Sequence, residues 1–110
     1  MSETTMIKKV ISDLNQHHLD AADFTANVIA NDASANERYV GFDQVLQMFT
    51  KYFFNTDTVT TITSITAAKP FKYDLFGTFT GDYAAHVPQA GYLTFFFVDG
   101  RIDFIDSAFL

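Results

Sequence analysis

The sequence predicts an α+β fold, with helices laid on one face of a curved sheet. Two periodicities support this prediction: apolar residues recur every three or four positions in the first half of the chain and every second position in much of the second half. A third observation, Asp99-Gly100, is the signal of a tight hairpin between antiparallel strands. The 110 residues match the ~100–150 typical of one hydrophobic core, so we expect a single domain over residues 1–110.

Three segments in the first half are predicted to be helical. The first is capped by Thr4 or Thr5, because a threonine hydroxyl can accept a free amide hydrogen of the first turn. A shorter segment covers residues 20–24, and a third helix begins after Gly41 and ends at Asn55. Each longer helix has one apolar face, formed by Met6, Ile7, Val10, Ile11 and Leu14 in the first and by Phe42, Val45, Leu46, Phe49, Tyr52 and Phe53 in the third.

Five segments are predicted to be strands. A brief strand at residues 28–30 precedes a polar, turn-prone stretch. Residues 59–66 are rich in β-branched side chains, but their apolar residues fall three apart, which predicts a bulge. Residues 71–79 alternate apolar and polar, residues 92–98 are apolar on both faces as in a strand covered twice, and residues 102–110 close the chain.

Composition excludes several classes of function. The chain is 48% hydrophobic and 18% charged, so it is not a disordered protein. It has no cysteine for disulfides or thiolate metal sites, and its net charge of −6 argues against a nucleic-acid partner. No secretory signal or run of 18 apolar residues occurs, so we expect a soluble, cytoplasmic protein without a membrane partner.

Three stretches resemble the nuclear transport factor 2-like superfamily, which includes ketosteroid isomerases and SnoaL-like polyketide cyclases. They are His18-Leu19-Asp20 followed by Phe24, Gly41 followed by Val45-Leu46 and Phe49, and the hairpin from Phe97 to Ile102. The resemblance implies a cone-shaped curved antiparallel sheet wrapped around N-terminal helices, a pocket at the open end of the cone, and frequent homodimers packed sheet to sheet. It does not imply one activity, because the superfamily contains enzymes, ligand carriers and interaction modules.

Asp32 is the candidate catalytic residue. In the ketosteroid isomerase pattern an acidic base closes the short strand eight residues after an aromatic residue, and Phe24 and Asp32 have that spacing. Partial burial in an aromatic-lined cone disfavours the charged carboxylate and suits it to take a proton from a substrate. The alternative is that Asp32 is a solvated turn residue that accepts a backbone N–H.

The partners of such a base are missing. The ketosteroid isomerase pattern places its two enolate-stabilising donors near Val10 and near Leu93 or Thr94. Valine and leucine cannot donate a hydrogen bond, and threonine is a weak replacement. Since losing one such donor costs on the order of a hundredfold in rate, we do not expect ketosteroid isomerase activity.

The remaining candidates are aromatic and acidic side chains. Phe49, Tyr52 and Tyr92 are predicted to contact a substrate, although most aromatic residues of the chain should form the core. Asp106 interrupts the apolar face that contains Ile102, Phe104 and Ala108, so it either lines the pocket or has a structural role, such as pairing across a dimer. The spacing of His17, His18 and His86 does not require a metal site, and we expect no cofactor.

Two functional hypotheses follow. The first is a SnoaL-like domain that binds a small apolar or aromatic molecule, with acid–base chemistry of the isomerase, cyclase or dehydratase type at Asp32. The second is a non-catalytic dimeric binding module whose pocket is filled by its own phenylalanines. In both, the apolar strand at residues 92–98 predicts a homodimer through the outer face of the sheet, because a soluble monomer rarely exposes so large an apolar patch.

Overall fold

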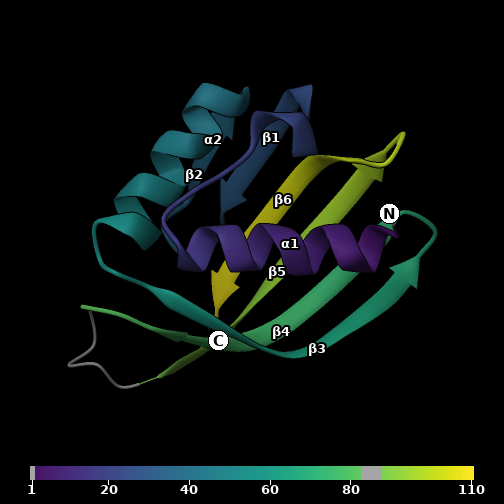
Figure 1. Ribbon diagram of the computed structural model, residues 1–110. Coiled ribbons are helices and arrows are strands. Elements are labelled where there is room, and N and C mark those ends of the chain that lie inside the picture. The colour runs from purple at the N-terminus through teal and green to yellow at the C-terminus, as the bar shows by residue number, and fades with distance from the viewer. Residues whose placement is uncertain (1, 83–87) are drawn as a thin grey trace.

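The computed structural model describes residues 2–82 and 88–110, and within them a six-stranded sheet curves around the first helix (Figure 1). The strand order is β2-β1-β6-β5-β4-β3. The elements in chain order are α1 (Glu3–Asn15), η1 (Ala21–Asp23), β1 (Phe24–Asp32), β2 (Glu37–Val40), α2 (Phe42–Phe49), η2 (Thr50–Phe54), β3 (Val59–Lys69), β4 (Lys72–Thr80), β5 (Gln89–Val98) and β6 (Arg101–Phe109). This arrangement confirms the α+β class.

The sheet is mixed and open, which corrects the expectation of an antiparallel sheet. β1 pairs with β6 in parallel, whereas the other neighbouring strands of the described residues are antiparallel. β2 and β3 form the two edges. The parallel junction was not predictable from local patterns because β1 and β6 lie at opposite ends of the sequence.

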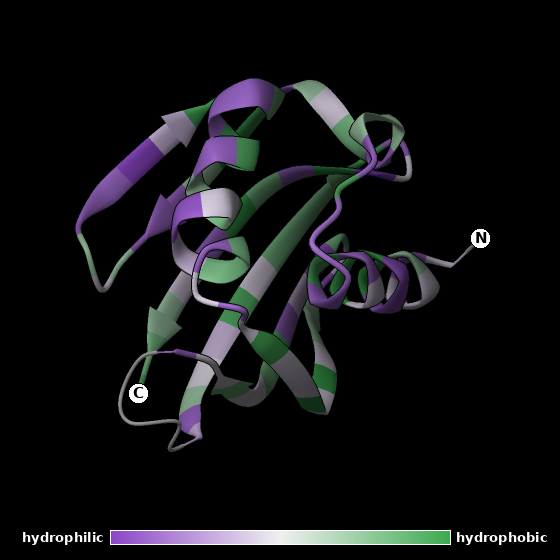
Figure 2. Ribbon diagram, turned by 60° about the vertical axis from the view of Figure 1, so that its left-hand side comes forward, coloured by the Kyte–Doolittle hydropathy of each residue, from purple (hydrophilic) through white to green (hydrophobic). Residues whose placement is uncertain are grey.

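The core lies between the helices and the concave face of the sheet. Both helices alternate hydrophilic and hydrophobic residues along their length, as Figure 2 shows. The predicted stripe of α1 is confirmed, because its apolar side chains are buried against the sheet. Directly paired residues share a face of the sheet, and the pairs Leu75–Leu93 and Phe95–Ile105 are fully buried on this inner face.

Several local predictions are confirmed. The register between β3 and β4 shifts between Ile62 and Ser64, where a bulge was expected. Asp99 and Gly100 both have positive φ, of 50° and 78°, as a primed hairpin turn requires. β5 differs from its prediction, because Phe96 and Val98 are 37% and 48% exposed on the outer face and the strand is covered on one side only.

Other boundaries differ from the predictions. Ser2 caps α1 in place of the predicted threonines, since its Oγ accepts the Thr5 N–H at 3.0 Å. The helical segment at residues 20–24 is a single 3-10 turn, and β1 is longer than its predicted three residues because β2 and β6 supply hydrogen-bonding partners on both sides. β2 was not predicted: it begins at Glu37, the last residue of the stretch 31–37 that was predicted to be turn-prone. None of the helices in the described part of the chain has the length and apolar character that a membrane crossing requires.

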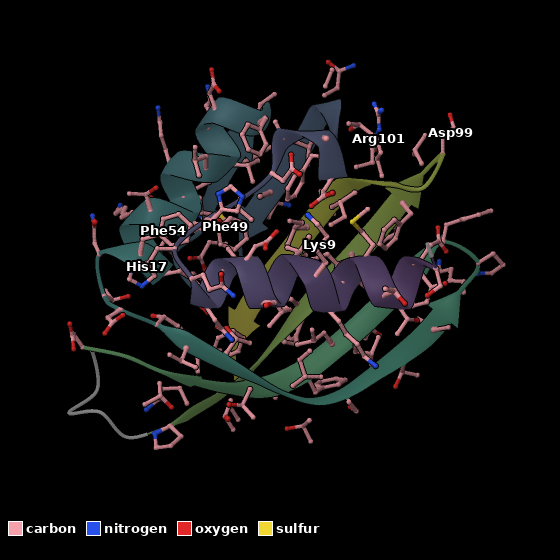
Figure 3. The ribbon with its side chains drawn as sticks, in the orientation of Figure 1. Lys9, His17, Phe49, Phe54, Asp99 and Arg101 are labelled. Atoms are coloured by element: carbon pink, nitrogen blue, oxygen red, sulfur yellow. The ribbon has the colours of Figure 1, made fainter. Side chains whose placement is uncertain are left out.

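Polar contacts fasten α1 to the rest of the fold. The Lys9 amino group donates to the buried carboxylate of Asp23 and to Asp13, and the Asp23 hydrogen bond is the main reason that the pKa of Lys9 is raised (Figure 3). At the other end of the helix, the Asn15 amide exchanges two hydrogen bonds with the Thr60 backbone, at 2.8 and 3.0 Å.

We expect Lys9→Met to destabilise the protein by about 2 kcal/mol, because it leaves the buried Asp23 carboxylate without its cation. Lys8→Met is the matched control, since Lys8 is exposed and the change should stay within about 0.5 kcal/mol. Urea unfolding of the two variants and the wild type measures the difference. Equal effects of the two substitutions would show that the Lys9–Asp23 contact does not hold α1 in place.

Candidate functional site

A cavity of about 260 Å³ lies between η2 and the inner face of the sheet. Its apolar walls come from η2, β4, β5 and β6, and polar side chains stand at the end where β1 turns into β2. The lining residues are Asp32, Ser34, Tyr52, Phe53, Thr56, Phe79, Tyr92, Leu93, Ser107, Ala108 and Phe109. Most of this surface is aromatic or aliphatic, which is typical of a small-molecule site.

Asp32 is half-buried in the wall of this cavity. It is the last residue of β1 and is paired with Ser107 of β6 and Glu37 of β2, which places all three on the inner face. Its Oδ1 also accepts the Ala35 N–H at 3.1 Å. The two interpretations offered by the sequence therefore coexist: Asp32 holds the β1–β2 turn and borders the cavity. Its catalytic role stays a prediction.

Tyr52 belongs to a small polar cluster that the sequence did not reveal. Its hydroxyl donates a hydrogen bond to Glu37, which also accepts one from the Tyr39 hydroxyl at 3.1 Å and lies 3.5 Å from the Lys51 amino group. The Tyr52 hydrogen bond is the largest reason that the pKa of Glu37 is lowered. Burial is the main cause that raises the pKa of Tyr39.

Glu37 could not be found from sequence because it falls in a polar stretch with no local signal. Only the β1–β2 pairing brings it opposite Asp32. The position of Tyr52 depends on η2, which continues α2 as one turn of π-helix. A π turn adds one residue per hydrogen-bonded ring and so rotates the side chains that follow. The predicted α-helix to Asn55 did not contain this rotation.

Two other predicted substrate contacts lie outside the cavity lining. Phe49 is 1% exposed in the core (Figure 3), where its ring packs edge-on against Phe53 at 5.1 Å between centroids. It therefore contacts Phe53, which lines the cavity, but does not line the cavity itself. Asp106 is on the opposite, outer face of the sheet, paired with Thr94 of β5. There it borders a shallow depression that also contains Arg38.

Tyr92 and Thr94 complete the predicted positions on β5. Tyr92 borders the cavity, and its ring also packs against Phe76 at 6.2 Å between centroids. Thr94 was the remaining candidate for an enolate-stabilising donor. Its hydroxyl lies on the outer face and donates to Asp74 Oδ1 at 2.9 Å, so it does not point into the cavity.

Neither His17 nor His18 joins the site. His17 Nε2 lies 3.0 Å from Asp57 Oδ1, and its ring stacks on Phe54 (Figure 3). His18 is exposed after α1, and His86 lies outside the described residues. Within the described residues, no three His, Asp or Glu side chains gather in an arrangement that could hold a metal ion.

Tyr52→Phe should reduce the loss of stability in acid. A carboxyl group whose pKa is lower in the folded protein than in the unfolded chain stabilises the fold above its unfolded pKa, and this stabilisation is lost as the pH falls through its folded pKa. Because Tyr52 contributes most to lowering the pKa of Glu37, the wild type should lose more free energy of unfolding than Tyr52→Phe between about pH 6 and pH 3.

Urea unfolding at both pH values measures this loss, with Tyr39→Phe as the matched control. Tyr39 donates to the same Glu37 oxygen but lowers its pKa less, so its removal should have a smaller effect. Equal acid losses in the wild type and Tyr52→Phe contradict the assigned contact.

Comparison with known proteins identifies the fold. No family model and no curated protein matches the sequence. Among solved structures, a "putative polyketide cyclase" from Sinorhizobium meliloti superposes with a TM-score of 0.83 at 14% identity, over 97% of this chain and 99% of that chain. A "putative ketosteroid isomerase" from Kribbella flavida gives a TM-score of 0.81 at 19% identity, over 98% and 77%.

A third structure is a nuclear transport factor 2-like protein of unknown function from Cytophaga hutchinsonii. It superposes with a TM-score of 0.80 at 11% identity, over 100% of this chain and 91% of that chain. All three matches extend over nearly the whole chain at identities where only the fold is comparable. They confirm the resemblance read from the sequence: the chain has the nuclear transport factor 2-like fold.

Proposed function

We propose that residues 1–110 form one domain that binds a small apolar or aromatic molecule between η2 and the sheet. The observation that carries this proposal is the cavity of about 260 Å³ with its aromatic and aliphatic walls. An apolar cavity of about 150 Å³ is enough to hold benzene, so this one has room for a two-ring aromatic molecule. The names of two structural neighbours, a ketosteroid isomerase and a polyketide cyclase, are names of small-molecule enzymes and support the same reading.

Asp32 is the group we assign to any proton transfer in this cavity. It is half-buried and faces the space where a ligand would lie. The lining favours binding over enolate chemistry, because Leu93 has no hydrogen-bond donor in its side chain and Thr94 donates to Asp74 on the other face. Stabilisation of a developing oxyanion needs donors aimed at it.

Naphthalene should bind in this cavity, and Ser107→Phe should weaken its binding at least about tenfold by filling the space from β6. Ser64→Phe is the matched control, because Ser64 is exposed on β3 and outside the lining. Backbone amide chemical shifts during titration locate the site. No binding, or shifts that map away from the lining residues, would contradict the proposed function.

The outer face of the sheet is the surface for a homodimer. Phe76 and Phe96 are 41% and 37% exposed there, and their rings pack against Tyr92 and Phe104 of neighbouring strands. These rings form two pairs, one across β4 and β5 and one across β5 and β6, with Thr94 between them on β5. Exposed aromatic side chains are enriched at protein interfaces. Asp74 and Asp106 flank Thr94 on the same face.

Sedimentation at micromolar concentration should therefore give a particle of twice the 12.4 kDa chain mass. Phe96→Glu should shift it to the monomer, because a charge buried at the centre of an apolar contact is costly. Val40→Glu is the matched control, since Val40 is exposed on the edge strand β2, which does not adjoin β4, β5 or β6. A wild-type particle of 12.4 kDa would rule out the dimer.

A further inference from the structure

We infer that the cavity selects ligands with a cationic hydrogen-bond donor, an amine carried on an aromatic or alicyclic body, and that Asp32 is its counter-ion. This inference rests on the proposed function and names the ligand class for that site. It rests on the hydrogen bonds in which the hydroxyls of Tyr52, Thr56 and Ser107 already donate their protons.

Two of the lining hydroxyls donate to backbone carbonyl oxygens. Thr56 Oγ1 lies 2.8 Å from the Tyr52 carbonyl oxygen, and Ser107 Oγ lies 3.3 Å from the Asn31 carbonyl oxygen. A carbonyl oxygen can only accept a hydrogen bond, so each contact requires the proton of the hydroxyl. Thr58 Oγ1, 2.8 Å away, donates to one lone pair of Thr56 Oγ1. The other Thr56 lone pair and those of Ser107 remain to accept a hydrogen bond from a ligand.

The Tyr52 hydroxyl is also already a donor. It donates a hydrogen bond to the Glu37 carboxylate, and this hydrogen bond is the main cause that lowers the pKa of Glu37. Glu37 therefore stays ionised at neutral pH and keeps accepting. Tyr52 also offers only lone pairs to a molecule in the cavity.

Asp32 adds an incompletely satisfied carboxylate. Its Oδ1 accepts the Ala35 N–H at 3.1 Å, and Oδ2 has no hydrogen-bond donor among the described residues. Glu37 faces it across the β1–β2 pair on the same side of the sheet. Glu37 is paired with Lys51, but the described lining contains no Lys, Arg or His that would neutralise Asp32 from inside the cavity.

Two lining hydroxyls keep their protons, those of Ser34 and Tyr92. The Tyr92 ring packs against Phe76 of the outer face, and its hydroxyl has no acceptor among the described residues. Ser34 Oγ accepts the Phe109 N–H at 2.9 Å, and its own hydrogen is uncommitted, but Ser34 is exposed in the β1–β2 turn. The other polar groups of the lining, on Asp32, Tyr52, Thr56 and Ser107, are thus acceptors. Beside them a ligand carbonyl or carboxylate would lose its water without gaining a donor, whereas an ammonium group would gain charge-assisted hydrogen bonds.

The size of the cavity limits the body that carries the amine. At the packing density of protein interiors, about 0.74, a cavity of about 260 Å³ is filled by a molecule of roughly 190 Å³. Two fused aromatic rings with a one-carbon side chain fit this limit. The rings would lie against Phe53, Phe79 and Leu93, and the amine would reach the end of the cavity where Asp32 stands.

The test compares three probes with the same rings: naphthylmethylamine, naphthylmethanol and naphthoate. Their dissociation constants are measured by calorimetry and by amide chemical shifts for the wild type, Asp32→Asn and Asp106→Asn. Asparagine also accepts the Ala35 N–H, so Asp32→Asn preserves the turn. Asp106→Asn removes the same charge from the outer face, outside the cavity lining.

We expect the wild type to bind the amine at least about tenfold more tightly than the alcohol, because one charge-assisted hydrogen bond is worth that much, and to bind naphthoate most weakly. Asp32→Asn should abolish the preference for the amine over the alcohol. Asp106→Asn should keep the preference.

Three other outcomes overturn the inference. Equal binding of amine and alcohol refutes the cation preference and leaves the proposed function standing, since the cavity still takes the rings. Equal loss of preference in both aspartate variants would trace it to net charge and not to contact with Asp32. Absence of binding by all three probes refutes the proposed function together with the inference.

Discussion

The parallel pairing of β1 with β6 determines on which face of the sheet the polar groups of these two strands lie, Asp32 and Ser107 of the candidate site among them. In this register Asp32 is opposite Ser107 on the inner face, and Asn31 is opposite Asp106 on the outer face. A shift of one residue would exchange the two faces. Hydrogen bonds past the end of the strand hold the register, because the Ala33 N–H donates to the Ser107 carbonyl oxygen at 2.8 Å and the Phe109 N–H donates to Ser34 Oγ at 2.9 Å.

A chain of aromatic rings connects the core to the cavity. Phe49 packs edge-on against Phe53, Phe53 against Phe79, and Phe79 against Phe109, with centroid distances of 5.1, 5.9 and 5.7 Å. The last three rings also line the cavity. Some of the 13 phenylalanines of the chain therefore belong to the hydrophobic core and to the cavity lining at the same time. The same side chains that hold α2 on the sheet shape the binding space, which explains why composition alone could not tell a lined cavity from a filled one.

Sequence reasoning succeeded where a structural rule acts within a few residues. The stripe of α1, the bulge near Ile62 and the primed turn at Asp99-Gly100 were all predictable for this reason. The spacing from Phe24 to Asp32 also placed Asp32 at the end of the right strand. It failed where partners come from distant parts of the chain, as in the extra length of β1, the strand β2, and the contact of Tyr52 with Glu37.

A bulge in β6 explains why the alternation of side chains along the strand did not place Asp106 on the correct face. Ile102 and Phe104 are two residues apart and should share a face, but Ile102 pairs with Phe97 and Phe104 pairs with Phe96. The register shift between them turns Ile102 inward and Phe104 outward, and Asp106 follows Phe104 to the outer face. No composition signal marks this bulge, so the face of Asp106 could not be assigned from sequence.

We propose that Asp32, and not an outer carboxylate, faces the bound ligand from the rim of the cavity, and a crystal structure of the protein with naphthylmethylamine tests this placement. We expect the rings between Phe53, Phe79 and Leu93, with the amine nitrogen within hydrogen-bond distance of the Asp32 carboxylate. Rings bound on the outer face, or an amine turned away from Asp32, would contradict it.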